Sequence, residues 1–471
     1  MKMMIGTGRV DASSSETIRV MNPVTGECID SVPAATEEDI AQAIKFAQEG
    51  KQAWGSISMR DRADIILKAS RLVLEKMEPI ATQLVKETGK VYKEACGEVR
   101  NAAGLLRTYA EKGRSMYETI LPHQTDLIMV RHEPLGVIAC IVPFNFPIEM
   151  YAQKVAPALV AGNAVIVKPA TETPLSAFLI SEILHEAGVP QTALQVVTGR
   201  GGTIGKFLSG SPGIDGISLT GSTEVGIDIA SNAAKNITRT YLELGGNDVL
   251  IVLDDADIEK AVASAVACRT YCAGQVCSAS KRFLVDNKIR QVFEKKLVDR
   301  LQTIKIGDPF DPDVGMGSLI SANAAMNVER QVQHTVHQGA KCILGGSANG
   351  AFFPPAVLTG VTPDMDIAKD MEVFGPVFPI IGFDTEEEAL SIANQSSYGL
   401  AGGIVTENIS RGQKLAGKID TGMVVINPPH VYRTFDIPFG GHKMSGIGNE
   451  GAYITLTEMM KLKTIVLTKM L

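Results

Sequence analysis

A cysteine, a glutamate and an asparagine, each in a Gly- or Pro-rich segment, could together perform acyl chemistry. Cys277 follows the run Gly-Gln-Val, Glu243 begins the run Glu-Leu-Gly-Gly, and Asn145 is the centre of Pro-Phe-Asn-Phe-Pro. A thiolate is a nucleophile, a carboxylate can act as a general base, and a side-chain amide can donate a hydrogen bond to an oxyanion. A lone cysteine is more often a small buried apolar residue. The three together predict a catalytic cleft, provided that the fold brings them together.

Length and composition indicate a globular protein of several domains. A chain of 471 residues is too long for one ordinary core, so we expect two or three domains. The net charge of −7, with no long basic run, argues against nucleic acid as a partner. No segment has the roughly 18 apolar residues of a membrane span, and the N-terminus lacks the apolar core of a secretory signal. We therefore expect a cytoplasmic protein with no membrane segment.

The cysteine pattern favours neither disulfides nor a metal. The seven cysteines are odd in number and include no Cys-x-x-Cys pair, so neither a disulfide framework nor a zinc site is indicated. A reducing compartment fits this pattern. His334 and His337 are three residues apart on an expected helix, but no other ligand accompanies them, so no metal is predicted.

The order of strands and helices predicts parallel sheets. Helical spacing of apolar residues predicts helices over 36–53, 60–87 and 94–112, and 126–142 is interpreted as two strands around a turn. From about residue 150 strands and helices alternate, which is typical of a parallel sheet with crossover helices. The expected strands cover 164–167, 194–197, 216–219, 249–253, 423–426 and 462–467, and the expected helices cover 174–187, 204–208, 223–234 and 257–269.

Two glycine-rich loops could bind phosphate. The segments 199–205 and 220–226 each follow an expected strand and open an expected helix. Small residues at such a point allow an anion to approach the free N–H groups of the helix. Neither segment is a regular Gly-x-Gly-x-x-Gly motif, and a single one could be a simple turn. Two in successive strand–helix units favour a dinucleotide site.

These segments together resemble the aldehyde dehydrogenase superfamily. The similarity extends from about residue 20 to the end, and its motifs are Pro143–Pro147, Gly221–Gly226, Glu243–Gly246, Gly274–Cys277, Glu372–Pro376 and Pro438–Gly446. The chain is most similar to the branch of lactaldehyde, non-phosphorylating glyceraldehyde-3-phosphate and phosphonoacetaldehyde dehydrogenases, with succinate-semialdehyde dehydrogenases close by. The resemblance implies an NAD(P)-dependent oxidoreductase.

It also implies roles for the three residues. Cys277 attacks the aldehyde to give a thiohemiacetal, and Asn145 with the backbone N–H of Cys277 holds the oxyanion. Loss of hydride leaves a thioester, and Glu243 activates the water that releases the acid. An enzyme that passes the acyl group to coenzyme A is an alternative, but such members usually lack the residue that matches Glu243. An inactive binding or structural homologue is a second alternative.

The resemblance further implies a cofactor site and a preference for NADP. Its residues are Lys168, Thr171, Gly201, Gly221, Ser222, Glu372 and Phe374. Thr171 stands where members that prefer NAD commonly carry a glutamate. A carboxylate would repel a 2′-phosphate, whereas a hydroxyl beside Lys168 can bind it. We therefore predict that NADP is preferred and that NAD is possible; the competing interpretation is that Glu172 takes the place of that glutamate.

The substrate pocket implied by the resemblance is short and polar. Its expected lining is Arg107, Phe146, Gln153, Val276, Ser278, Tyr432, Arg433 and Phe439. Arg107 and Arg433 resemble positions that bind anionic substrates, although a salt bridge would also explain either one. Val276 stands where phosphate-handling members often carry arginine, which weakens the case for glyceraldehyde 3-phosphate. The prediction is a short polar aldehyde such as lactaldehyde or succinate semialdehyde.

The expected fold is α/β and aldehyde-dehydrogenase-like. A Rossmann-type cofactor domain is expected over 1–120 and 141–245, a catalytic domain over 246–447, and a small β oligomerisation arm over 121–140 and 448–471. Addition of strands across subunits would cover the edges of the arm, so a homodimer or homotetramer is expected. Cys272, five residues before Cys277, is either a small buried residue or a redox partner of the nucleophile.

Overall fold

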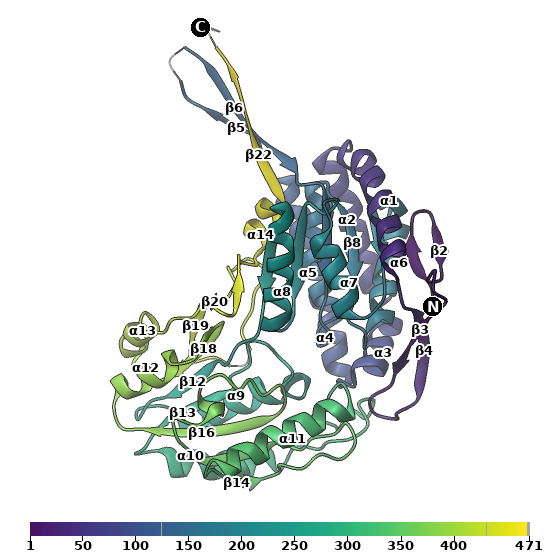
Figure 1. Ribbon diagram of the computed structural model, residues 1–471. Helices are drawn as coiled ribbons and strands as arrows, with labels where there is room; N and C mark the ends of the chain where they lie inside the picture. The colour runs from purple at the N-terminus through teal and green to yellow at the C-terminus, as the bar shows by residue number, and fades with distance from the viewer. Residues whose placement is uncertain (124, 430, 469–471) are drawn as a thin grey trace.

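The computed structural model describes residues 1–123, 125–429 and 431–468 of the chain. Two α/β regions lie one above the other, and a narrow three-stranded sheet projects away from them (Figure 1). Each region contains a mostly parallel sheet with helices on both faces, so the predicted α/β class is confirmed. Within the described residues, no helix is long and apolar enough to cross a membrane.

The first region is built on an eight-stranded sheet. In spatial order its strands are β2 (Gly8–Val10), β1 (Met3–Ile5), β9 (Leu194–Val196), β8 (Ala164–Lys168), β7 (Val137–Ile141), β10 (Gly216–Thr220), β11 (Arg239–Glu243) and β21 (Gly446–Ile447). The five strands from β9 to β11 are parallel, and β1, β2 and β21 pair antiparallel at the edges. The central strands are fully buried, which is typical of a sheet covered on both faces.

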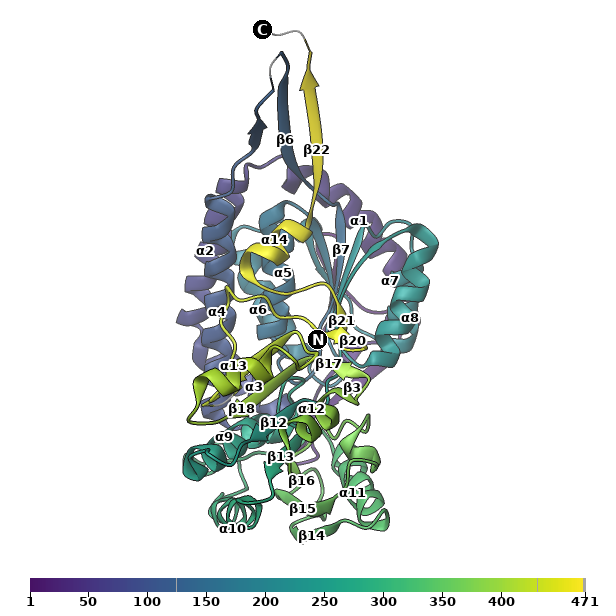
Figure 2. The same ribbon diagram turned by 90° about the vertical axis from the view of Figure 1, so that its left-hand side faces the viewer.

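Helices cover the two faces of this sheet, as Figure 2 shows. One face carries α1 (Glu37–Gly55), α7 (Gly201–Gly210) and α8 (Thr223–Ala233), and the other carries α2 (Met59–Glu75), α3 (Met77–Thr88), α4 (Tyr92–Arg114), α5 (Glu149–Ala161) and α6 (Pro174–Ala187). The single helix predicted over 60–87 is wrong. Lys76 leaves the helical conformation, and Pro79 has no N–H to donate to Glu75, so the chain forms two helices.

The second region is built on a seven-stranded sheet. Its spatial order is β14 (Lys341–Leu344), β15 (Ala356–Val361), β16 (Val377–Phe383), β13 (Arg282–Asp286), β12 (Val249–Val252), β18 (Ala401–Val405) and β19 (Met423–Ile426). All neighbouring strands are parallel except the pair of β14 and β15, which is antiparallel. One face packs on α9 (Ile258–Thr270) and α10 (Arg290–Leu301), and the other on α11 (Ala322–His337), α12 (Glu386–Asn394) and α13 (Ile409–Ala416).

The projecting sheet contains β5 (Thr119–Leu121), β6 (Leu127–Pro134) and β22 (Met460–Leu467). The last two pair along their whole length. The boundaries predicted for the arm at 140 and 448 are wrong. Val137–Ile141 is a fully buried central strand of the first sheet, and α14 (Ala452–Glu458) packs on α4 and α5. Residues 124 and 469–471 of the predicted arm lie outside the described residues.

Two short pairs complete the strands: β3 (Thr17–Met21) with β4 (Cys28–Pro33), and β17 (Tyr398–Gly399) with β20 (His442–Lys443).

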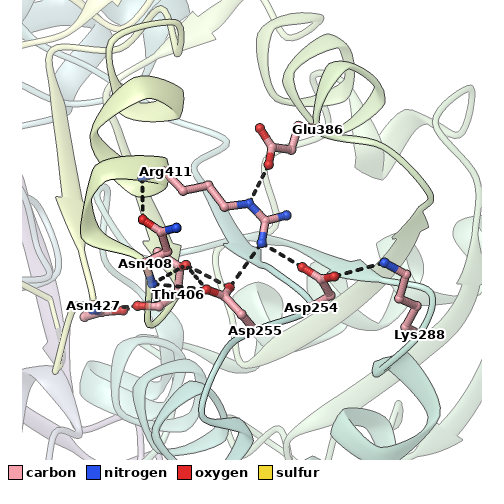
Figure 3. Close-up of polar contacts among 8 residues, drawn as sticks. All are labelled: Asp254, Asp255, Lys288, Glu386, Thr406, Asn408, Arg411 and Asn427. Carbon is pink, nitrogen blue, oxygen red and sulfur yellow. Dashed lines mark hydrogen bonds and ion pairs between the residues drawn. The ribbon is translucent and has the colours of Figure 1, made fainter.

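An ionic network at one end of the second sheet fixes the start of the loop that follows β19. Figure 3 shows Arg411 of α13 between the carboxylates of Asp254, Asp255 and Glu386. Asp255 accepts a hydrogen bond of 2.8 Å from Thr406, and the Thr406 N–H donates to Asn427 Oδ1 over 3.0 Å. The loop that leaves Asn427 therefore begins from a fixed point.

Candidate active site

Five loops meet at the carboxyl edge of the first sheet. The chain builds β7, β8 and β9 in one direction and then returns to place β10 on the other side of β7. Ligands of open α/β sheets bind at such a switch point, outside the carboxyl ends of the strands. The predicted residues at this edge are Asn145 after β7, Lys168 on β8, Gly201 after β9, Gly221 and Ser222 after β10, and Glu243 on β11.

The segment 272–278, called the nucleophile loop from here on because it contains the predicted nucleophile Cys277, has an unusual backbone. At its start, Cys272 and Ala273 have φ angles of 50° and 51°, which residues other than glycine rarely adopt. Gly274 follows with φ 76°, and a Cβ there would lie 2.5 Å from the Gly375 carbonyl carbon. Only glycine fits at this close approach. The Gly-Gln-Val-Cys motif and the Glu372–Pro376 motif are thus in direct contact.

Two buried cations, Arg269 and Lys281, hold the Gly274–Cys277 and Glu372–Pro376 segments together, and the sequence analysis predicted neither of them. Arg269 of α9 donates to the carbonyls of Gly274 at 3.2 Å and Val377 at 3.0 Å. Lys281 donates to the Cys277 carbonyl and lies 3.3 Å from Glu372 Oε1. In the sequence, each is one basic residue among 45 with no motif around it.

Asn145 is buried and directed at the nucleophile loop. Its Nδ2 donates to the Gln275 carbonyl at 2.8 Å. A carboxamide nitrogen has two N–H donors, so this bond fixes the amide and leaves the second donor for a ligand. The geometry suits an oxyanion donor next to Cys277.

Glu243 and Cys277 face each other in an environment that disfavours charge. Glu243 is 4% exposed, and neither of its oxygens has a hydrogen-bond partner of normal geometry among the described residues. The pKa of Glu243 is raised to about 7, mainly by burial and secondly by the charge of Glu450, whereas the hydrogen bond from the Cys277 thiol lowers it. The pKa of Cys277 is raised well above its usual value, mainly by burial and secondly by the charge of Glu243. Cys277, the predicted nucleophile, is therefore a thiol beside a carboxylate that can accept its proton.

Behind Glu243 lies a group of three charges. Glu450 accepts from Lys154 at 3.0 Å and also pairs with Arg433. The guanidinium of Arg433 lies 4.3 Å from the centre of the Phe439 ring. Burial alone would lower the pKa of Arg433, but the nearby carboxylates raise it, so this residue stays charged.

A cavity of about 690 Å³ opens above Cys277. Seven predicted residues lie in its wall: Asn145, Phe146, Gln153, Val276, Cys277, Ser278 and Arg433. The Gln153 amide donates to the hydroxyl of Tyr109 at 2.7 Å, which fixes its orientation.

Arg107, Tyr432 and Phe439 are absent from the described wall of this cavity. Arg107 is exposed and lies 3.9 Å from Glu111. Arg107 is two residues after Leu105 on α4, which is a rotation of about 200° around the helix axis. Because Leu105 lines the cavity, Arg107 points away from it. The 431–438 loop alternates between half-buried and exposed residues, so Tyr432 points outward next to inward Arg433. Phe439 is buried, and its ring packs against the guanidinium of Arg433.

Sequence reasoning missed Asn101, Glu149, Tyr271 and Thr434, which also line the cavity. Glu149 accepts from Asn101 at 3.1 Å, and burial raises its pKa. The sequence signals for these residues were weak: Asn101 and Leu105 share a helical face, and Glu149 begins α5 four residues after Asn145.

The residues at the edge of the first sheet fit a dinucleotide. Lys168 is buried without a described hydrogen-bond partner, and burial lowers its pKa to about 8. A Cβ on Gly201 would lie 3.9 Å from its ammonium nitrogen, so the cation lies beside the exposed first turn of α7. Such an arrangement binds phosphate.

The other expected cofactor residues have the following places. Ser222 caps α8 and is exposed, and Thr171 is half-buried. Glu372 accepts from the Gly246 N–H at 3.3 Å, and Phe374 packs edge-on against Phe144, with ring centroids 5.9 Å apart.

The described residues include no group of three or more His, Cys, Asp or Glu side chains placed to hold a metal. His334 instead bonds to Asp366 at 2.7 Å.

A Rossmann-like carboxyl edge beside a cysteine, an amide and a buried carboxylate is typical of an NAD(P)-dependent oxidoreductase. The sequence pattern of the aldehyde dehydrogenase family matches residues 10–465, and the chain belongs to this family. The resemblance stated from the motifs is therefore confirmed.

Known relatives cover almost the whole chain. The NADP-dependent succinate-semialdehyde dehydrogenase of Escherichia coli is 36% identical over 96% of this chain and 95% of its own length. A lactaldehyde dehydrogenase structure is 34% identical, covers 99% of both chains and superposes with a TM-score of 0.96. The NAD⁺ complex of betaine aldehyde dehydrogenase from Staphylococcus aureus is 34% identical over 100% of this chain and 95% of its own, also with a TM-score of 0.96. The predicted aldehyde-dehydrogenase-like fold is confirmed.

Proposed function

We propose that this enzyme oxidises a short polar aldehyde to its carboxylic acid, with NADP preferred over NAD. The aldehyde is of the lactaldehyde type or, as the alternative, of the succinate semialdehyde type. One observation carries the proposal: buried Glu243 faces Cys277 next to the fixed amide of Asn145, beneath a cavity whose largely apolar wall also carries polar side chains such as Gln153 and Ser278.

The chemistry follows from what each residue can do. Glu243 takes the proton of the Cys277 thiol, and the sulfur adds to the aldehyde carbonyl carbon. The oxyanion of this thiohemiacetal accepts hydrogen bonds from the second N–H of Asn145 and from the backbone of Cys277. When bound, NADP supplies the two-electron acceptor for the hydrogen of the aldehyde. Glu243 releases the thiol proton to solvent before the second stage. Water then loses a proton to Glu243 and opens the resulting thioester, and Glu243 returns this proton to the departing sulfur of Cys277, which releases the acid and restores the thiol.

The position of Glu243 favours water over coenzyme A as the acyl acceptor. A carboxyl with a pKa of about 7 is half ionised at neutral pH, which suits a general base. Measurement of the acid and the acyl-CoA in the same reaction separates the two outcomes. The intact set of Cys277, Asn145 and Glu243 also disfavours an inactive homologue.

The charges of the cavity favour a hydroxylated aldehyde over an anionic one. Among the described lining residues only Glu149 and Arg433 are charged. Arg433 is already paired with Glu450, whereas Glu149 has no ion pair among the described residues; Asn101 donates to it, and the charges of Arg433 and Lys90 act on it. Burial raises the pKa of Glu149, so an incoming carboxylate or phosphate is repelled by the ionised fraction of this residue. This supports a lactaldehyde-type substrate and weakens glyceraldehyde 3-phosphate and phosphonoacetaldehyde.

The preference for NADP rests on three residues. Lys168 and Thr171 lie at the carboxyl end of β8, and Glu172, the competing carboxylate, is exposed. The Lys168 ammonium has no described hydrogen-bond partner, although the charge of Glu172 acts on it; an ammonium without a hydrogen-bonded partner favours an additional phosphate. A kcat/KM ratio that favours NAD tenfold or more would overturn this part of the proposal.

The substrate part is tested with four aldehydes of similar length under NADP reduction: lactaldehyde, succinate semialdehyde, glyceraldehyde 3-phosphate and butanal. We expect kcat/KM to be highest for lactaldehyde. A tenfold advantage of either anionic aldehyde would contradict the substrate assignment but leave the reaction type intact.

The projecting sheet supports assembly of several subunits. Its edge strands β5 and β22 carry exposed apolar side chains, including Ile120 and Leu462. Unpaired strand edges favour association with another chain. We propose a homodimer or homotetramer, which light scattering of the wild type and of Leu462→Asp tests; an unchanged mass that equals one chain in both proteins would overturn it.

A further inference from the structure

Three buried ionisable residues lie beneath the catalytic loops and outside the cavity wall. Lys90 connects α3 to α4, and Glu94 and Glu98 are one turn apart on α4. The side chains of Lys90 and Glu98 are 1% and 0% exposed. None of the three lines the described cavity, so substrate contact does not explain them.

Lys90 holds the Asn145 segment. Its ammonium donates to the Asn145 carbonyl at 2.7 Å, pairs with Glu98, and lies 4.4 Å from the centre of the Phe146 ring. The contact is made to the backbone of the same residue whose side chain donates to the Gln275 carbonyl. A shift of Lys90 would therefore move the amide that faces Cys277.

Glu98 fixes the other end of the same segment. One of its oxygens pairs with Lys90, and the other accepts the N–H groups of Ile148 at 2.9 Å and Glu149 at 3.3 Å. These N–H groups are at the start of α5, where the helix itself offers no acceptor. The ion pair thus holds the turn from Asn145 to α5 at both ends.

Glu94 holds the nucleophile loop. Its carboxylate accepts the N–H of Cys272 at 3.2 Å, at the residue with φ 50°. A non-glycine residue in this conformation costs about 1–3 kcal/mol and persists only where its surroundings fix it. The Cys272 thiol in turn donates to the Asn145 carbonyl at 3.6 Å. Asn145 and the nucleophile loop are therefore connected through α4.

Stability alone is a weak explanation for this cluster. A buried ion pair gains little over well-packed apolar residues, because desolvation offsets the attraction. Its directional bonds, however, fix two loops that approach each other from different sheets.

We propose that Lys90, Glu94 and Glu98 are positioning residues that set the placement of the Asn145 amide relative to the Cys277 sulfur. The inference rests on the roles proposed above for Cys277 and Asn145, and it requires no particular aldehyde. Misplacement of a catalytic group by about 1 Å costs on the order of 100-fold in rate. The cluster therefore acts on the rate of acyl-enzyme formation and not on NADP affinity.

The main test is the double variant Lys90→Met/Glu98→Gln, which removes both charges and so leaves neither one unpaired. In stopped-flow measurements with any oxidised aldehyde, we expect the rate of the NADPH burst to fall about 10–100-fold. The Kd of NADP, measured by fluorescence, should stay within twofold. The matched control is Lys76→Met/Glu186→Gln, an exposed pair at the other end of α3, which should leave the burst unchanged.

A double-mutant cycle separates positioning from general damage. If the pair acts through Asn145, its loss should cost less than threefold in an Asn145→Ala background. An equal loss in both backgrounds, or an unchanged burst in the double variant, would overturn the proposal. If Asn145→Ala itself leaves the burst unchanged, the role of Asn145 fails, and the inference fails with it.

The Glu94 variants give a second test that leaves the ion pair intact. Glu94→Gln keeps an oxygen that can accept the Cys272 N–H and should remain within threefold of the wild-type burst rate. Glu94→Leu removes this acceptor, and its burst rate should fall about tenfold. Equal burst rates in the two variants would contradict the role of Glu94.

Discussion

Replacement of Glu243 by glutamine is expected to stabilise the protein at alkaline pH while it slows turnover. The substitution keeps the shape of the side chain and removes its charge. Burial and the charge of Glu450 raise the pKa of Glu243 from 4.5 to about 7 in the folded protein. Each pKa unit is about 1.4 kcal/mol, so the ionised carboxylate destabilises the folded state by about 3 kcal/mol.

The sign follows from the direction of the shift. Because the folded-state pKa lies above the unfolded value, the stability that the protonated carboxyl contributes is complete below about pH 4.5. It is lost as the pH rises through about 7. Glutamine does not titrate, so the free energy of unfolding of Glu243→Gln should exceed that of the wild type by about 3 kcal/mol more at pH 8 than at pH 4.5.

Urea unfolding at pH 4.5, 6, 7 and 8, at one protein concentration, measures this difference. The matched control is Glu118→Gln, an exposed residue paired with Arg131, for which we expect no such trend. In the same variant, at a pH high enough for the Cys277 thiol to ionise without Glu243, a burst of about one NADPH per active site should precede steady turnover that is slower by about 10²–10⁴-fold, the usual contribution of a general base.

Two results would refute this reasoning. A stability difference that stays constant from pH 4.5 to 8 would mean that Glu243 has an ordinary pKa. Undiminished steady turnover in Glu243→Gln would mean that another group activates the water.

Three further variants test the cofactor, the substrate and the neighbouring cysteine. Lys168→Met should raise the KM for NADP at least tenfold with little change in kcat; an equal rise in the KM for NAD would show that Lys168 does not recognise the 2′-phosphate. Glu149→Gln should raise kcat/KM for succinate semialdehyde relative to lactaldehyde, by at most about tenfold, because it removes the repulsion from the ionised fraction of Glu149, whose pKa burial raises; an unchanged ratio contradicts the charge argument. Burial raises the pKa of Cys272 to about 12, so Cys272→Ala should lose activity in peroxide at the wild-type rate, and inactivation that is reversible by thiols in the wild type alone would instead support a disulfide with Cys277.

Much of the fold and the catalytic motifs could be predicted from the sequence, because their causes are local. The helix predicted over 174–187 matches α6 at both ends, since Pro174 suits the first turn and Gly188 follows the last. The Gly-rich segments mark places where another backbone comes close, as Gly274 does against Gly375.

The rest of the site depends on contacts between distant parts of the chain. Arg107 and Asn101 lie on the same helix, and only the packing of α4 on α5 decides which of them faces the cavity. The bond from Lys90 to Asn145 joins residues 55 positions apart. The spacing of apolar residues in a segment predicts whether it is a helix or a strand, but not how the element is rotated about its axis when it packs on another. The cavity-facing side of α4 and the bond from Lys90 to Asn145 could therefore not be predicted.

The pair of Glu243 and Cys277 also makes a prediction about pH. Each group is buried, and the charge of Glu243 contributes to the raised pKa of Cys277. Two groups that are coupled in this way titrate as one unit, with apparent pKa values that belong to the pair. Because the same carboxylate accepts a proton from the thiol and later from water, the burst rate and the steady rate should both rise with one ionisation near pH 7.

In Glu243→Gln the rise of the burst rate should move to higher pH, because burial still holds the pKa of the Cys277 thiol above its usual value. Stopped-flow measurements from pH 5.5 to 10 detect the shift. A burst rate with the same pH dependence in wild type and variant would show that the thiol loses its proton to a group other than Glu243.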